Sequence, residues 1–143
     1  MADGAGYFLK LRRVLRREIE ENASNEYPNE SCGLLIGGRN GVETVVESVT
    51  AALNLNSERA HDRYVLDPDD FARADRIAAA HDLDVVGIWH SHPDHPAEPS
   101  QTDLDAAWPG YSYVIVSVTK GRAGTVRSWR LTNGRFEEER VEL

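Results

Sequence analysis

A nearly continuous apolar run limits what this chain can fold into more than any other feature of its sequence. Residues 83–89 read Leu-Asp-Val-Val-Gly-Ile-Trp, with one charged side chain among them. Such a run is typical of a central strand that is covered on both faces. Prolines follow at positions 93, 96 and 99. Because proline has no amide to donate to a neighbouring strand, we expect residues 93–99 to leave the sheet as a stiff loop.

Three segments have helical patterns. Apolar residues at near-helical spacing predict a helix within residues 7–25. Asp67 and Pro68 predict the N-cap and the first residue of a second helix, which ends near His81. A short third helix is expected over residues 101–107.

Extended segments fill most of the remaining chain. The sequence Asn40-Gly41 predicts a hairpin turn. Besides the central run, strands are expected at 32–36, 42–50, 63–66, 111–118, 125–131 and 136–142. Helices and strands in this order predict a single α/β domain over residues 1–143, with a mixed β-sheet flanked by helices.

Composition excludes some classes of protein. The 143 residues are 41% hydrophobic, which is enough for one folded core. Acidic residues outnumber basic ones by 24 to 16, the net charge is −8, and no basic patch stands out, so we expect no nucleic-acid partner. We expect most of the carboxylates, including the run Glu137-Glu138-Glu139, to lie on the surface. Only two of the 16 basic residues are lysines, which fits either a salt-rich cytoplasm or a GC-rich genome.

The single cysteine and the apolar segments bear on the compartment. One cysteine, Cys32, excludes an internal disulfide and any zinc site built from several cysteines, and fits a reducing cytosol. Since it opens an apolar run, we expect it to be buried and inert. Residues 1–4 carry no apolar leader, and no apolar run approaches the roughly 20 residues of a membrane span. We therefore expect a soluble, cytoplasmic protein with no membrane contact.

The chemistry is concentrated just after the central strand. Side chains two apart on a strand share a face, so His90 and His92 project side by side at its end. The proline-rich loop then returns the chain into a helix that can bring Asp103 to the same point. Three protein ligands with one open position are typical of a catalytic zinc site. The same two-histidine, one-carboxylate set also suits iron.

Each of these residues has an ordinary alternative. A single histidine at a strand end is commonly a surface or hydrogen-bonded residue, and His95 in the loop is expected to be one. Ser100-x-x-Asp103 also matches a helix capping box, in which Ser100 is simply the N-cap. The joint spacing, with seven residues between His92 and Ser100, favours the metal site over these separate explanations.

The pattern His-x-His, seven residues, Ser-x-x-Asp resembles the JAMM signature of the MPN+ (Mov34/PAD-1) metalloproteases. The segment Glu30-Ser31-Cys32-Gly33 resembles the upstream glutamate element of that family, 60 residues before His90. The resemblance spans nearly the whole chain and implies the MPN (cytidine-deaminase-like) fold in its compact prokaryotic form. It implies one Zn²⁺ per chain, held by His90, His92 and Asp103. Glu30 is then the general base for a metal-activated water, and Ser100 is the oxyanion donor.

The resemblance also implies a substrate class. We expect hydrolysis of peptide or isopeptide bonds at the C-terminal tail of a ubiquitin-like or sulfur-carrier protein, or of an adduct of that tail. A non-catalytic MPN scaffold is the main alternative, although such domains typically lose site residues and all five are present here. A zinc deaminase is a further alternative, but its paired cysteines are missing. The oligomeric state is open, with a homodimer as one option.

Overall fold

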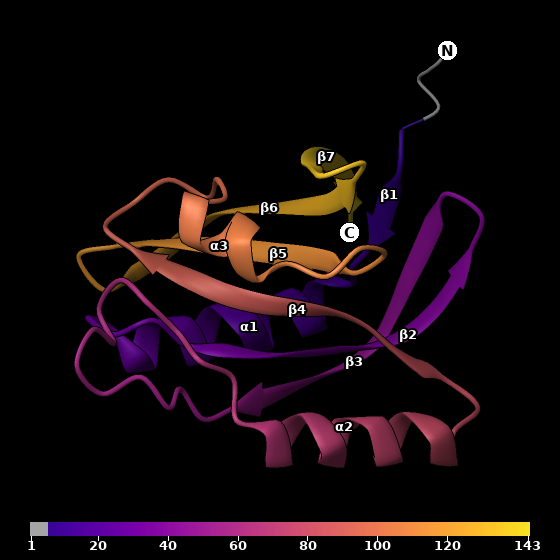
Figure 1. Cartoon of the computed structure of the whole chain (residues 1–143), viewed down its shortest axis with the longest axis horizontal. Coiled ribbons are helices and arrows are strands. Elements are labelled where there is room, and N and C mark those ends of the chain that lie inside the picture. Colours follow the sequence, from indigo (N-terminus) through magenta and orange to yellow (C-terminus); the bar gives the residue numbers. More distant parts are fainter. Residues whose placement is uncertain (1–5) are drawn as a thin grey trace.

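Seven strands form one mixed sheet in the computed structural model, which describes residues 6–143 (Figure 1). In spatial order the sheet runs β1-β3-β2-β4-β5-β6-β7, and it closes because β1 pairs in parallel with β7. Residues 1–4, where we expect no apolar leader, lie outside the described residues. The strands are β1 (Phe8–Lys10), β2 (Cys32–Asn40), β3 (Glu43–Ala52), β4 (Asp84–Pro93), β5 (Ser112–Thr119), β6 (Arg122–Thr132) and β7 (Arg135–Glu142).

The central run forms β4, as predicted. It lies between β2, to which it is antiparallel, and β5, to which it is parallel. The expected end before Pro93 is wrong, because β4 continues through His90 and His92 and ends at Pro93. Pairing with β2 stops at His90, so Pro93 has one neighbouring strand instead of two. The lack of an amide proton at Pro93 therefore disrupts no pairing with β2.

Two helices cover the two sides of the sheet. α1 (Arg13–Glu26) packs on a cluster that includes Leu35 and Trp89, whereas α2 (Pro68–Ala80) packs on a cluster that includes Leu34 and Ile88. Neighbouring residues of one strand thus belong to different clusters, as the alternation of side chains along a strand requires. Figure 1 shows α2 running along the outside of the sheet near β2 and β3. The predicted mixed sheet with flanking helices is confirmed. The closure of the sheet was not predicted.

The beginning of the chain differs from the prediction. The expected helix over 7–25 starts only at Arg13, because Phe8–Lys10 forms β1 between β3 and β7. Leu11, which seemed to belong to the apolar face of that helix, is fully buried in the turn between the two elements. The apolar residues that looked like one face of a single helix therefore belong to two consecutive elements, β1 and α1.

The other boundaries mostly agree with the prediction. Asp67 caps α2 by accepting a hydrogen bond from the Asp69 amide, and Pro68 is its first residue. The Asn40-Gly41 turn is confirmed, with Gly41 at a φ of 65°. The expected strand at 63–66 is wrong, since this segment makes only an isolated bridge between Asn54 and Leu66. A short helix, α3 (Gln101–Ala106), follows the proline-rich loop.

The run of glutamates in β7 is only partly on the surface. Glu137 and Glu138 are exposed, but Glu139 is 1% exposed, so the surface prediction is wrong for this residue. Its carboxylate accepts hydrogen bonds from Ser112, Ser128 and Arg130 at 2.7–3.1 Å. Glu138 points to the opposite face of the strand. Glu137 shares the face of Glu139 but lies nearer the start of β7, where that face is exposed. None of the helices in residues 6–143 is long and apolar enough to cross a membrane.

Candidate metal centre

Three side chains from two elements converge at the end of β4. The Nε2 atoms of His90 and His92 lie 3.2 Å apart. From the first turn of α3, Asp103 places Oδ1 3.3 Å from His90 Nε2 and Oδ2 3.1 Å from His92 Nε2. Both histidines are buried and the Asp103 side chain is 9% exposed. The structure therefore brings together the three residues that the spacing pointed to.

The distances among these atoms suit one small cation. Ligands about 2.0–2.1 Å from a tetrahedral zinc ion lie roughly 3.3 Å from one another. The Nε2–Nε2 separation of 3.2 Å lies close to that edge length, and each nitrogen has one Asp103 oxygen at a similar distance, Oδ1 at 3.3 Å from His90 and Oδ2 at 3.1 Å from His92. One ligand atom from each of the three residues lies within 4.8 Å of the other two. Nitrogen and carboxylate oxygen are also the donor types that zinc accepts. By geometry and by donor chemistry, the three residues fit the ion that the family resemblance implies.

Outer contacts fix how the two imidazoles are presented. His92 Nδ1 lies 2.9 Å from the Pro96 carbonyl oxygen, so this nitrogen donates and Nε2 is free to bind a metal. The ring of Tyr64 stacks on His90, with centroids 4.6 Å apart. Burial lowers the pKa of His90 against the opposing effect of Asp103. A lowered pKa keeps the His90 ring neutral, as a metal ligand must be.

Asp103 is also part of the helix cap that the sequence allowed. Ser100 Oγ accepts a hydrogen bond from the Asp103 amide at 3.1 Å, and Asp103 Oδ2 accepts one from the Ser100 amide at 2.8 Å. Burial acts to raise the pKa of Asp103, but its hydrogen bonds with His90, His92 and the Ser100 amide outweigh burial and hold that pKa well below its usual range. The capping box and the converging triad are therefore present together and share one carboxylate.

Glu30 lies beside the triad as a buried carboxylate. It is 6% exposed, and its Oε1 atom has no hydrogen-bond partner among the described residues. Burial is the main reason that the pKa of Glu30 is raised to about 8. The adjacent Ser31 is joined to Ser91, which lies between the two histidines: Ser91 Oγ accepts from the Ser31 amide at 2.8 Å. Glu30 is thereby attached to the strand that carries both histidines.

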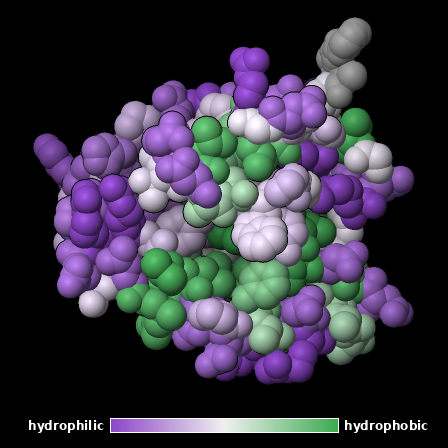
Figure 2. All heavy atoms as spheres, viewed as in Figure 1, coloured by the Kyte–Doolittle hydropathy of each residue, from purple (hydrophilic) through white to green (hydrophobic). Residues whose placement is uncertain are grey.

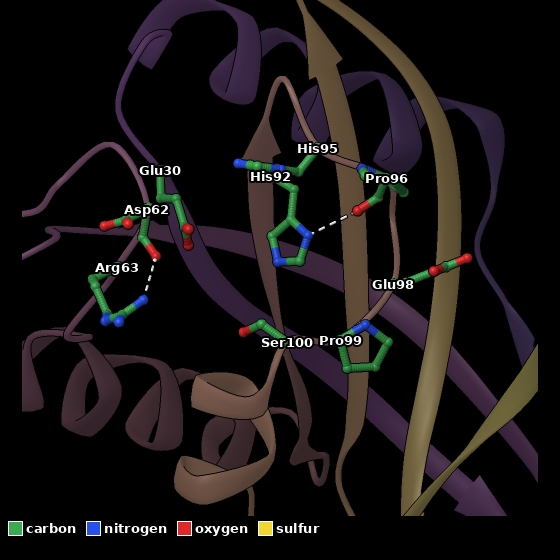
Figure 3. A pocket seen from close by; sticks show the side chains of 9 residues that line it. All are labelled: Glu30, Asp62, Arg63, His92, His95, Pro96, Glu98, Pro99 and Ser100. Carbon is green, nitrogen blue, oxygen red and sulfur yellow. Dashed lines mark hydrogen bonds between the residues drawn. The ribbon is translucent and has the colours of Figure 1, made fainter.

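The triad opens into a cleft. Figure 3 shows Glu30, Asp62 and Arg63 on one side of His92, with Pro96 and Glu98 on the other. This part of the cleft has a volume of about 330 Å³, and an adjoining cavity of about 260 Å³ shares Glu30, Asp62 and Arg63 with it. On the face of the molecule that is seen in Figure 1, Figure 2 shows hydrophobic side chains gathered around a hollow, with hydrophilic ones around them. A peptide segment can therefore reach the triad from solvent.

Other residues near the site in the sequence occupy ordinary positions. His95 is exposed in the loop and Cys32 is buried, with its pKa raised to about 12, chiefly by burial. Trp89 belongs to the core, whereas Trp108 is 68% exposed at the edge of the cleft. Asp105 accepts a hydrogen bond from Gln101 and is not part of the triad.

Sequence reasoning missed two residues of the site. Tyr64 stacks on His90 from a segment expected to be a strand. Asn54 donates from Nδ2 to the carbonyl oxygens of both Glu30 and Arg63, each at 3.1 Å. Neither lies in a motif. The irregular composition of residues 51–62 gave no indication that an amide there would connect two loops.

Comparison with known proteins agrees with this geometry. The family described as prokaryotic homologs of the JAB domain matches residues 12–132. A solution structure of a protein from Desulfitobacterium hafniense superposes with a TM-score of 0.82 at 29% identity, covering 94% of this chain and 91% of that one.

Two relatives carry names that state an activity. The desampylase of Haloferax volcanii is 38% identical over 136 residues, which is 92% of this chain and 91% of the relative. The CysO-cysteine peptidase of Mycobacterium bovis is 31% identical over 141 residues, which is 98% of this chain and 94% of the relative. The predicted resemblance and the predicted enzyme class, a JAMM-type peptidase, are confirmed. With most of its length matched and its His-His-Asp triad in place, the chain belongs to the family of prokaryotic homologs of the JAB domain.

Proposed function

We propose that this chain is a zinc-dependent hydrolase of peptide or isopeptide bonds at the C-terminal tail of a ubiquitin-like or sulfur-carrier protein. The convergence of His90, His92 and Asp103 beside buried Glu30 is the observation that carries the proposal. The names of the two relatives support the substrate class. The proposed compartment is the cytoplasm, where a single reduced cysteine is ordinary.

The proposed ligands are the two Nε2 atoms and the Asp103 carboxylate. When bound there, zinc supplies Lewis acidity and lowers the pKa of water to near 7. The Pro96 carbonyl keeps the His92 ring in the orientation that directs Nε2 toward the other two ligands. The Ser100 amide does the same for Asp103 by holding Oδ2.

Glu30 is the proposed general base. It is no member of the triad, so its carboxylate is available to take a proton from the attacking water and pass it to the leaving amine. Its environment favours that cycle, because a carboxyl group with a pKa raised to about 8 accepts a proton readily near neutral pH. A cation bound by the triad would favour its ionised form and so prepare it as a base.

Ser100 is the proposed oxyanion donor, and its role as a helix cap is compatible with this. In the capping box Ser100 Oγ accepts a hydrogen bond, from the Asp103 amide. A hydroxyl group has one donor in addition to its two acceptor lone pairs. The Ser100 proton therefore remains available for the oxygen of the substrate carbonyl as negative charge develops on it.

Two alternatives make different predictions. A non-catalytic scaffold would need no converging triad and no buried, partnerless carboxylate, so the geometry favours an enzyme. The same three ligands also suit iron, and metal analysis of protein purified without added metal distinguishes iron from zinc. The cytidine-deaminase-like description of the fold and a homodimeric assembly stay predictions.

Metal content and cleavage, measured on the same preparation, test the proposal. We expect one zinc ion per chain and cleavage of carrier-protein tails joined through Gly-Gly to an amine. His90→Ala and Asp103→Ala should each lose zinc, whereas Asp105→Ala, in the same helix as Asp103 but outside the triad, should retain it.

Two results would contradict the proposal separately. Absence of cleavage of every Gly-Gly-linked substrate by zinc-loaded protein would reject the proposed reaction. Unchanged zinc content in Asp103→Ala would reject the ligand assignment.

A further inference from the structure

Arg63 stands out among the charged side chains of the cleft. Of the residues that line its two adjoining cavities, Arg63 is the one arginine or lysine, and it lines both. The acidic side chains there include Glu30, Asp62 and Glu98. In a chain with a net charge of −8, a guanidinium group facing the cleft marks the place where an anion would be most favoured.

The acidic residue next to Arg63 in the chain is already paired. Asp62 receives two hydrogen bonds from Arg59, from Nε to Oδ1 at 3.0 Å and from Nη2 to Oδ2. Arg63 reaches only the Asp62 carbonyl oxygen, at 3.3 Å from Nη1. It forms no ion pair with any residue in the part of the chain that the structure describes. Most of its donors are therefore available to a ligand.

The backbone of Arg63 is held in a fixed relation to Glu30. Its amide donates to the Arg59 carbonyl at 2.8 Å. Asn54 Nδ2 donates to the carbonyl oxygens of Glu30 and Arg63, while Asn54 Oδ1 accepts from the Val65 amide at 3.0 Å. One side-chain amide thus joins the loop of the proposed base to the loop of Arg63. Arg63 is positioned by the fold instead of lying on an untethered loop.

We infer that Arg63 binds a carboxylate of the leaving group and so sets the substrate preference of the enzyme. The inference rests on the proposed function. Glu30 delivers its proton to the leaving amine, so groups on the Glu30 side of the cleft meet the leaving part of the substrate. Figure 3 shows Arg63 on that side of His92. A guanidinium fork matches a carboxylate with two parallel hydrogen bonds.

The carboxylate has two candidate sources: the free C-terminus of a small leaving amino acid, or an acidic side chain beside the acceptor lysine. Paired substrates distinguish them. In the first pair, a carrier tail ending in Gly-Gly is joined to alanine as the free acid or as the carboxamide. In the second pair, the same tail is joined to the ε-amine of a lysine whose neighbour in the acceptor peptide is aspartate or asparagine. We expect zinc-loaded wild-type protein to prefer the carboxylate member of at least one pair. The expected preference in kcat/KM is about tenfold to one-hundredfold, the range for a hydrogen bond to a charged group.

Variants assign that preference to Arg63. Arg63→Gln should reduce the ratio to near one, mainly through a higher KM for the carboxylate substrate. The ratio within each pair is the readout, because loss of the Arg63 charge beside Glu30 acts on both members alike. Arg63→Lys should keep part of the preference, because it retains the charge and loses the fork. Arg59→Gln should also lower the ratio, because it frees Asp62 to pair with Arg63. Arg17→Gln, on the exposed face of α1, is the control for loss of one positive charge.

The other possible results reject either the role of Arg63 alone or the proposed function as well. If zinc-bound Arg63→Gln keeps the wild-type ratio, or if wild-type protein cleaves both members of both pairs equally, the inference is wrong and the proposed function stands. If Arg63→Gln loses zinc, the ratio measured for Arg63→Lys and Arg59→Gln decides instead. If zinc-loaded wild-type protein cleaves none of the four substrates, the proposed function itself fails and the inference fails with it.

Discussion

At the scale of single residues, Asp103 is the most heavily shared side chain of the site. One carboxylate contacts both histidines and closes the cap of α3. The position of the helix and the position of the third ligand are therefore set by the same hydrogen bonds. A change at Ser100 or Asp103 alters both at once, so the variants that separate local structure from chemistry must be chosen with care.

Glu30→Gln should abolish most activity and keep the metal. The amide cannot accept the proton of the attacking water, so we expect a loss of about 10²–10⁴-fold in kcat, the usual contribution of a general base. Zinc content should be unchanged, since Glu30 is outside the triad. A variant with full activity would remove Glu30 from its proposed role.

The same substitution should change how stability depends on pH in chelator-treated protein. Because the folded state raises the pKa of Glu30 from 4.5 to about 8, it holds a proton that the unfolded chain releases. Wild-type stability should therefore fall as pH rises between those values, and Glu30→Gln should not show this fall. The free energies of unfolding, measured in denaturant, should agree near pH 4 and differ by a few kcal/mol near pH 9, at about 1.4 kcal/mol per pKa unit. Equal curves for the two proteins would show that the Glu30 pKa is not raised.

Two variants at Ser100 separate the cap from the donor. Glycine is nearly as good an N-cap as serine, whereas alanine costs about 1 kcal/mol. If the hydroxyl proton serves the oxyanion, Ser100→Gly and Ser100→Ala should both lose about 10²–10³-fold in kcat. If the cap alone matters, the activity of Ser100→Gly should stay close to wild type, and that result would count against the donor role.

Much of the site was predictable at this scale, and the reason is local. His90, His92 and Asp103 lie on one strand and the next helix, so spacing along the chain nearly determines their separation. Tyr64 and Asn54 reach the site from an irregular segment, through stacking and hydrogen bonds that depend on the folded path of residues 53–66. No periodicity in the sequence encodes such a path.

At the scale of elements, β2 and β4 must approach closely at Gly33. A Cβ atom added there would overlap the Thr50 carbonyl and the indole of Trp89, which donates to that same carbonyl at 2.9 Å. The absence of a side chain on β2 thus makes room for the largest core residue of β4. The pairing that results places Cys32 opposite His90 and brings Glu30 toward the triad.

Gly33→Ala should therefore destabilise the protein, by about 1–3 kcal/mol or more as expected for an overpacked core. Gly38→Ala in the same strand is the matched control, because nothing lies within 4 Å of a Cβ atom at that position. Chemical denaturation of both variants provides the comparison. Similar stabilities would mean that β2 moves aside without cost.

The elements were predicted best where they are long and strongly patterned. The buried runs of β4 and β5 and the capped start of α2 agree with the sequence because each depends on its own residues. β1 was missed because its three residues have no pattern of their own. Its conformation comes from two neighbours far away in the chain, β3 and β7.

At the scale of the whole molecule, a buried polar cluster connects four strands. Glu139 of β7 receives hydrogen bonds from β5 and β6, and Arg130 of β6 also donates to Thr44 of β3 at 2.8 Å. The Glu139 side chain is 0% exposed and that of Arg130 is 6% exposed. A cluster of this kind fixes which strands meet, because an apolar replacement at one member leaves the others unpaired.

Glu139→Ala should cost about 3–5 kcal/mol of stability, the usual result of leaving a buried charge without its partner. Glu138→Ala is the control one residue earlier, where an exposed ion pair with Arg127 is worth no more than about 1 kcal/mol. The free energy of unfolding of each variant in urea gives the comparison. Equal losses would show that burial of the Glu139–Arg130 pair is not what stabilises the closed sheet.

The closure of the sheet has a consequence for synthesis. β1 is the first described strand to leave the ribosome and β7 is the last, yet the two pair side by side. Until β7 has emerged, β1 lacks one neighbour and the nascent sheet keeps two open edges that other chains can join. Because pairing between distant parts of a chain forms slowly, this last step also limits how early the finished enzyme appears. A growing chain of this protein therefore needs protection from neighbouring chains until β7 has emerged and paired with β1.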